Sequence, residues 1–495
     1  QSFLAKRHDP LNSVKFYLDK VIQTNKMALF SIDLDSYISP QYLLWGIIAC
    51  TFVEYLFELY LNLRQNKVYR TAEKVPEVLR NTLDKETFEK SRDYGKDKNL
   101  FSTFSDAYSM ITLTALLLCD GLFKGWELTD SMLSSIGVWP GGWNIEIGRS
   151  MCFIVIAMMF NTVVGLPLSI YSTFVLEEKH GFNKQTVGFF VRDFIKKILV
   201  SIIFMTPIVG LIVKIVQAGG DLFFIYLWAF SFALLMFFMT IYPVVIAPLF
   251  DKYTPLKDGP LKARIEALAA RIKFPLTKLY VVEGSKRSAH SNAYLYGFFN
   301  NKRIVLFDTL IKGYIAEDSP AEDKKSESES STKKEDEKGC NDEEIEAVLG
   351  HELGHWKLGH VVKNIVISQI NLLFVFAFFA FFQKSSVLYE AFGFPRNSEK
   401  PVFIGLIIIL QFLLQIYNTA MGYIMNVLSR LYEFQADQFA VQLGYGKDLK
   451  SALVKLNKDN LGFPISDPLY SAWHHSHPTL LQRLAAIDVD MAKKK

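Results

Sequence analysis

The sequence predicts a mainly α-helical, polytopic membrane protein in which a bundle of seven transmembrane helices carries a polar domain on its cytosolic side. Half of the 495 residues are hydrophobic and 14% are aromatic, although 21% are charged. The mean hydropathy of +0.18 therefore requires apolar and charged residues to be segregated along the chain. Disordered chains lack this apolar content. The formal net charge of +4 is too small to indicate a nucleic-acid partner.

Seven apolar runs are candidates for membrane spans. A spanning helix needs about 20 apolar residues, because it must cross about 30 Å of hydrocarbon. The runs lie at 41–63, 104–123, 150–172, 197–217, 222–250, 364–383 and 402–425. The second is the weakest, since it contains Asp106 and Asp120. Residues 37–250 are thus expected to hold spans one to five, and residues 364–425 spans six and seven.

Two polar stretches are expected to form one extramembrane domain in two parts, 251–363 and 426–495. The first part contains the strand-like runs 278–283 and 303–307, rich in β-branched and aromatic residues, which predict a small β-sheet. Its segment 316–342 is dense in Glu, Lys, Asp and Ser and predicts a disordered insertion. Residues 1–36 form an N-terminal extension in this scheme.

The distribution of basic residues predicts the orientation in the membrane. The predicted loop 65–103 contains nine Lys and Arg residues, whereas the loop 124–149 contains two. An excess of Lys and Arg in short loops marks the cytoplasmic side of a membrane protein. Both parts of the polar domain follow odd-numbered spans, as the loop 65–103 does, so they are expected on the cytosolic side; the motifs described next make this the predicted catalytic domain.

The motif that indicates chemistry is His351-Glu-Leu-Gly-His355, an HExxH string. Histidines at i and i+4 lie on one face of a helix, close enough to ligate one ion. Glu352 is placed to touch a water on that ion. Zn²⁺ is the usual occupant, and a catalytic zinc keeps three protein ligands and one open position. The alternative is a polar helix start with surface histidines.

A third ligand is predicted from the last polar block. Glu433 and Asp437 are spaced i, i+4, so they lie on the same face of a helix. One carboxylate could bind the metal, and the other could accept a hydrogen bond from the outer nitrogen of a ligating imidazole and so orient it. An ordinary acidic helix face is the alternative. His360 follows His355 by five residues and is expected to face away from the ligands. An even number of predicted membrane crossings separates His351 from Glu433, so both residues can lie on the cytosolic side of the membrane.

A third segment, Trp473 to Arg483, offers hydrogen-bond donors. Pro478 suits the first turn of a helix. His477 and Arg483 could then donate to a developing oxyanion. Solvated histidines near an exposed terminus explain the same pattern equally well.

Together these segments resemble the type I CAAX prenyl proteases, a family of membrane zinc metalloproteases. The resemblance covers roughly residues 40–490 and includes Phe174-Val-Leu-Glu-Glu-Lys-His-Gly-Phe-Asn183, the Gly350–His360 motif and Asp459-Asn-Leu-Gly-Phe-Pro464. It implies a seven-helix barrel around a water-filled chamber, embedded in the lipid of the endoplasmic reticulum and inner nuclear membranes. It also implies one Zn²⁺ per chain and removal of the last three residues after a prenylated cysteine, with a second upstream cut in some members that process prelamin A or a-factor.

The resemblance also implies roles for individual residues. Asn292 and Ala293 match the segment that lies along the substrate backbone, and the strand near His290 is expected to pair with an extended substrate. His477 and Arg483 match the residues proposed to stabilise the tetrahedral intermediate. Residues 1–36 extend beyond the usual start of the family.

The sequence leaves two alternative functions. An intramembrane metalloprotease of the site-2 type takes a ligand Asp from an LDG-like motif within a membrane helix. The nearest string, Asp33-Leu-Asp35-Ser36, precedes the first span and lacks the Gly. A non-proteolytic transporter or scaffold would use its cavity for clearance of lipid or protein, and the intact HExxH motif argues against it.

Overall fold

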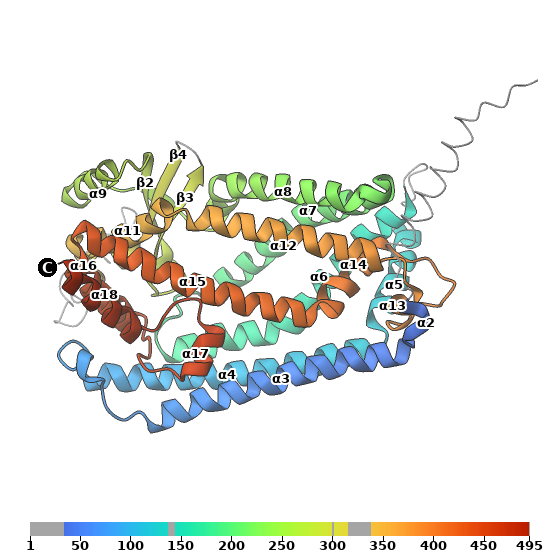
Figure 1. The fold of residues 1–495 in the computed structure, drawn as a ribbon, viewed down its shortest axis with the longest axis horizontal. Coiled ribbons are helices and arrows are strands. Elements are labelled where there is room, and N and C mark those ends of the chain that lie inside the picture. Colours follow the sequence, from blue (N-terminus) through green and yellow to red (C-terminus); the bar gives the residue numbers. More distant parts are fainter. Residues whose placement is uncertain (1–33, 137–143, 299–300, 315–337, 495) are drawn as a thin grey trace, which may run out of the picture.

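The structure, a computed structural model, describes residues 34–136, 144–298, 301–314 and 338–494. Nearly all of the predicted extension 1–36 lies outside these residues. Long helices run alongside one another over most of the length of the molecule, and a small sheet lies at one end of them (Figure 1). The predicted mainly helical fold with a small β-sheet is confirmed.

Among the described residues, five helices are long and apolar enough to cross a membrane. Four of them are α3 (Pro40–Thr71), α7 (Val187–Ala218), α8 (Phe223–Ile241, the central part of a span from Gly220 to Leu249) and α12 (His360–Phe382). The fifth is α6 (Ile145–Tyr171), which continues as the π-helix η2 (Ser172–Glu177). Few residues in their most apolar windows are buried inside the protein. Exposed apolar faces of this kind are expected of helices that contact lipid.

Two further spans are bent helix pairs. Helix α4 (Lys85–Leu118) meets α5 (Gly121–Ile136) at 66°, and Asp120 at the joint has a positive φ of 53°. A left-handed residue interrupts a right-handed helix and so forces the bend. The second pair, bent by 62°, consists of α14 (Val402–Ile407) with the π-helix η8 (Ile408–Leu413) and α15 (Gln415–Leu443). Counting each pair as one span gives the predicted seven.

The basic stretch predicted as a loop, 65–103, is mostly helical. Helix α3 continues to Thr71, and α4 begins at Lys85 after the N-cap Asp84, whose side chain accepts a hydrogen bond from the Thr87 backbone. Only residues 72–84 connect the two helices, with a single turn η1 (Glu77–Leu79) between them. The prediction of a loop was wrong because Lys, Arg and Glu are good helix formers, and a helix need not end where it leaves the apolar layer.

One four-stranded sheet has the order β1-β2-β4-β3. Its strands are β1 (Tyr253–Pro255), β2 (Leu276–Val282), β3 (Ala293–Phe298) and β4 (Asn301–Phe307). Strands β2 and β4 are parallel, and the other two pairings are antiparallel. The predicted runs 278–283 and 303–307 correspond to β2 and β4. Helix α9 (Pro260–Arg271) packs its buried Ile265 and Leu268 into the same core as the sheet.

The helix that carries the HExxH motif, α11 (Asp342–Lys357), has a well-defined start. Asn341 and Glu344 form a capping box, in which each side chain accepts a hydrogen bond from the other residue's backbone N–H. Just before it, Cys340 is buried and pairs with Ile311 in a β-bridge. The predicted disordered insertion 316–342 therefore extended too far, because residues 338–342 have defined contacts; residues 316–337 lie outside the described part.

Three helices of the last polar block pack around α11 and α15. They are α16 (Gly446–Asp459), α17 (Pro468–His474) and α18 (Leu480–Lys494). The remaining short elements are α2 (Leu34–Tyr37), α13 (Ser386–Glu390), η3 (Gly220–Leu222), η4 (Tyr242–Ile246), η5 (Ala247–Leu249), η6 (Gly284–Lys286) and η7 (Asp308–Leu310). The small sheet, α9, α11, α16 and α18 thus lie at the same end of the bundle (Figure 1).

Candidate metal centre

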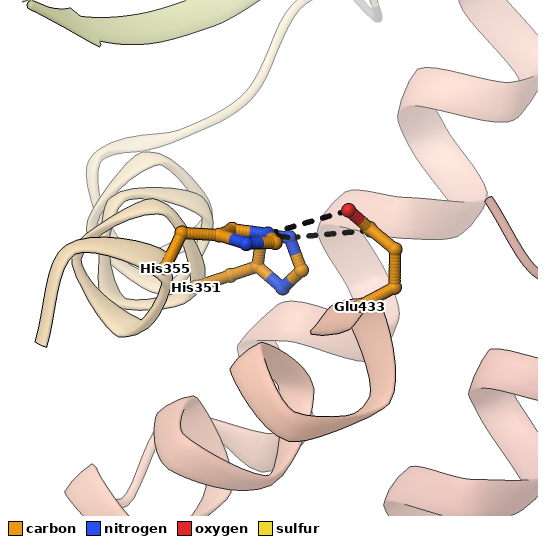
Figure 2. Close-up of side chains that lie close together, drawn as sticks. All are labelled: His351, His355 and Glu433. Atoms are coloured by element: carbon orange, nitrogen blue, oxygen red, sulfur yellow. Dashed lines mark hydrogen bonds and ion pairs between the residues drawn. The ribbon is translucent and has the colours of Figure 1, made fainter. Parts of the chain in front are cut away.

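His351 and His355 project from α11 toward Glu433 on α15 (Figure 2). The Nε2 atoms of the two imidazoles are 3.2 Å apart. Glu433 places Oε2 3.4 Å from Nε2 of His351 and Oε1 3.3 Å from Nε2 of His355. The three side chains form a group that could hold one metal ion. The predicted set of ligands from two distant segments is therefore brought together on one side of the bundle.

The geometry of this group suits a tetrahedral ion. Ligand atoms about 2.1 Å from a tetrahedral zinc are separated from each other by about 3.4 Å, and the contacts among the three side chains, which involve both carboxylate oxygens of Glu433, span 3.2 to 3.4 Å. Glu433 is buried, and its Oε2 makes only the longer ion-pair contacts among the described residues, 3.4 Å to Nε2 of His351 and 3.5 Å to Nη1 of Arg483. A buried carboxylate oxygen without a close hydrogen-bond donor is stabilised further by a bound cation. The residues present therefore fit a metal.

His351 is oriented from its outer nitrogen by a carboxylate. Its Nδ1 lies 2.8 Å from Oδ1 of Asp437, the residue one helical turn after Glu433 that was expected to orient an imidazole. Burial and Arg483 both lower the pKa of His351, but hydrogen bonds to Asp437 and Glu433 outweigh them and raise it to about 9. These carboxylates make the pocket attractive to a positive charge.

The second histidine, His355, is oriented by another imidazole. Its Nδ1 lies 3.0 Å from Nδ1 of His360, and Nε2 of His360 lies 2.9 Å from Oε1 of Gln435. His360 is not part of the ligand group, as predicted, but the expectation that it faces away from the ligands was wrong. The turn between α11 and α12 brings it back, because Gly359 adopts a left-handed φ of 69° and ends α11.

Glu352 lies close to the same charged side chains. It interacts electrostatically with both histidines, Glu433 and Arg483, and burial raises the pKa of its carboxyl. A carboxylate with a raised pKa beside a metal site is suited to accept a proton and to return it.

Arg483 and His477 both reach the centre but differ in surroundings. Arg483 forms a two-pronged contact with Asp437, from Nη2 at 2.6 Å and Nε at 2.8 Å, and its Nη1 is 3.5 Å from Glu433. Nε2 of His477 lies 3.3 Å from Oε1 of Glu433, while 62% of its side chain is exposed. Pro478 does not lie in the first turn of α18, which begins two residues later, where Thr479 and Gln482 exchange side-chain hydrogen bonds with each other's backbone.

The residues expected to bind substrate lie beside β3. Within the described residues β3 pairs with β4 alone, and it contacts α11. Ala293 is its first residue, and its backbone N–H donates to Oδ1 of Asn292. His290 is held by protein groups: its ring stacks on Phe182 with the centroids 4.1 Å apart, and its Nδ1 lies 3.1 Å from Oδ1 of Asn460. These contacts favour a supporting position for His290.

An HExxH helix, a distant glutamate and a polytopic helical bundle define the class of membrane-embedded metallopeptidases. Comparisons with known proteins agree. Residues 65–252 match the family model "CAAX prenyl protease N-terminal, five membrane helices", and residues 255–490 match "Peptidase family M48". The chain belongs to the M48 peptidase family, within its CAAX prenyl protease 1 branch.

Individual relatives cover nearly the whole chain. The human CAAX prenyl protease 1 homolog is 50% identical over 89% of this chain and 94% of its own length. The Saccharomyces cerevisiae CAAX prenyl protease 1 is 38% identical over 94% and 99%, respectively. The crystal structure of S. mikatae Ste24p matches with a TM-score of 0.78 and 39% identity, covering 90% of this chain and 99% of that one.

These findings do not favour the two alternatives raised by the sequence. The acidic residue of the site-2-like string that the structure describes, Asp35, accepts hydrogen bonds from Ser385 and from the Ser386 and Val387 backbones at the start of α13. Helices α2 and α13 lie at the end of the bundle opposite to α11 (Figure 1). A transporter or scaffold would not require the three converging ligands.

Proposed function

We propose that this protein removes the C-terminal tripeptide after a prenylated cysteine, using one zinc ion held by His351, His355 and Glu433. The observation that carries the proposal is the convergence of the two imidazoles and the Glu433 carboxylate, with contacts of 3.2 to 3.4 Å between the side chains, in a chain of the CAAX prenyl protease 1 branch. The site also lies directly before α12, a membrane-spanning helix that begins at His360. That position suits a substrate whose lipid is anchored in the bilayer.

Zinc in such a site lowers the pKa of a bound water toward neutrality. In the proposed mechanism Glu352 takes the proton from the attacking water and later gives it to the leaving amine. Asp437 holds His351 in the orientation that directs Nε2 at the metal. His477, which is exposed beside Glu433, donates to the oxyanion that develops on the scissile carbonyl.

Strand β3 would hold the peptide. Its edge away from β4 has no strand partner among the described residues, so an extended peptide can add to it through main-chain hydrogen bonds. Asn292 and Ala293 lie at the beginning of this edge, and β3 contacts the helix that carries the zinc ligands. Backbone pairing fixes the register of the substrate whatever its sequence.

Purified protein in lipid vesicles is expected to release the tripeptide from a synthetic farnesylated peptide ending in a CAAX sequence. Mass spectrometry identifies the product, and a longer substrate reports any second, upstream cut. The same peptide without the farnesyl group is the control and should be cleaved much more slowly. A zinc chelator should abolish the reaction, and one equivalent of zinc should restore it. Equal cleavage of both peptides would contradict the proposed substrate class.

The proposed location is the endoplasmic reticulum membrane and the inner nuclear membrane, with the sheet and the metal centre facing the cytosol or nucleoplasm. The basic residues between and beside α3 and α4 support this orientation. An epitope tag placed after Lys495 is expected to be digested when protease is added to intact microsomes. A tag that survives until detergent opens the vesicles would contradict the orientation.

A further inference from the structure

We propose that His360 is a positioning residue that, together with Gln435, fixes the tautomer and the ring orientation of the zinc ligand His355. The inference deepens the proposed zinc site and rests on it. It starts from an imidazole that neither the HExxH spacing nor the glutamate on α15 accounts for.

The hydrogen bonds of the three side chains admit one consistent arrangement for metal binding. In the arrangement that leaves Nε2 of His355 free for a metal, Nε2 of His360 donates its hydrogen to Oε1 of Gln435 across 2.9 Å. Nδ1 of His360 is then the acceptor in the 3.0 Å contact with Nδ1 of His355. His355 therefore carries its hydrogen on Nδ1, which leaves the lone pair of Nε2 directed at Glu433 and His351.

His360 is well placed to impose this arrangement because it cannot move easily. Only 2% of the residue is exposed, and its ring stacks on Tyr432 with centroids 4.1 Å apart and planes 8° from parallel. Tyr432 and Gln435 flank Glu433 on α15. One short segment of α15 thus supplies the third ligand and also both contacts that hold His360.

The two zinc-binding imidazoles are therefore supported in different ways. Nδ1 of His351 faces the carboxylate of Asp437, which is itself held by Arg483. Nδ1 of His355 faces an imidazole backed by an amide. Partners of this kind fix the orientation of a ligating histidine, and their loss typically weakens metal affinity about 10- to 100-fold.

The test compares two substitutions in purified full-length protein. His360→Leu removes the acceptor for His355, and the zinc dissociation constant, measured by competition with a chelator, is expected to rise about 10- to 100-fold. His360→Asn places an amide oxygen where Nδ1 lay, and zinc affinity should return close to the wild-type value. In protein reconstituted with Co²⁺, the d–d absorption bands should shift in the Leu variant and not in the Asn variant.

The matched control is His475→Leu, which removes a part-buried imidazole that contacts Ser471 instead of a ligand; zinc affinity should not change. Should His360→Leu fail to fold, Gln435→Met carries the test and should also weaken zinc binding. Wild-type affinity in both the Leu and Met variants, or equal weakening in the Leu and Asn variants, would overturn the role of His360. Wild-type protein without zinc would instead refute the proposed metal site itself.

Discussion

Protein with the substitution Glu352→Gln is expected to keep its zinc and to cleave a farnesylated peptide about 10²- to 10⁴-fold more slowly, the usual contribution of a general base. Glutamine has nearly the shape of glutamate, so the packing around this partly buried side chain should be preserved. An amide cannot accept the proton of the attacking water, however. The loss should therefore fall on kcat and not on metal content.

Zinc stoichiometry and single-turnover hydrolysis on the same preparation measure the two quantities. Glu343→Gln is the matched control, because Glu343 lies on the same helix α11 but pairs with Arg264 on α9, and it should leave kcat unchanged. Undiminished turnover by zinc-bound Glu352→Gln protein would remove Glu352 from the mechanism. Loss of zinc from the variant would show a role in holding the ion.

The metal ligands were predictable from sequence because their spacing is local on each helix. His351 and His355 are one turn apart on α11, and Glu433 and Asp437 are one turn apart on α15. The contact between His355 and His360 was not predictable in the same way. It depends on the left-handed turn at Gly359, which ends one helix and starts the next, and helical periodicity does not extend across such a turn.

The membrane fold was also predictable only in part. Apolar length located all seven spans, because hydrocarbon thickness sets a length that any spanning helix must reach. Length did not reveal the bends at Asp120 and Leu414, which depend on local backbone conformation. It also could not show that α15, the second part of the bent seventh span, continues unbroken to Leu443, so that Glu433 and Asp437 lie on the same helix as residues of that span.

Removing the guanidinium of Arg483 is expected to destabilise the whole site, whereas removing the imidazole of His477 should slow only the chemistry. The side chain of Arg483 is 12% exposed and neutralises Asp437 and Glu433. Breaking a buried ion pair by deleting one partner typically costs about 3–5 kcal/mol. Arg483→Met should therefore lower the thermal midpoint and the zinc affinity together. Arg483→Lys keeps the charge but not the two-pronged contact, so its effect should be intermediate.

His477→Ala should behave in the opposite way. Its side chain is 62% exposed and makes one contact with a ligand, so the thermal midpoint and zinc content should stay at wild-type values. Loss of an oxyanion donor typically lowers kcat about 10²- to 10³-fold. Thermal unfolding, zinc analysis and kcat on the three variants separate the two roles that sequence alone assigned jointly. If Arg483→Met kept both the wild-type midpoint and the wild-type zinc affinity while losing kcat, the expected role in holding the site would be contradicted and a role of the guanidinium in the chemical step would be favoured.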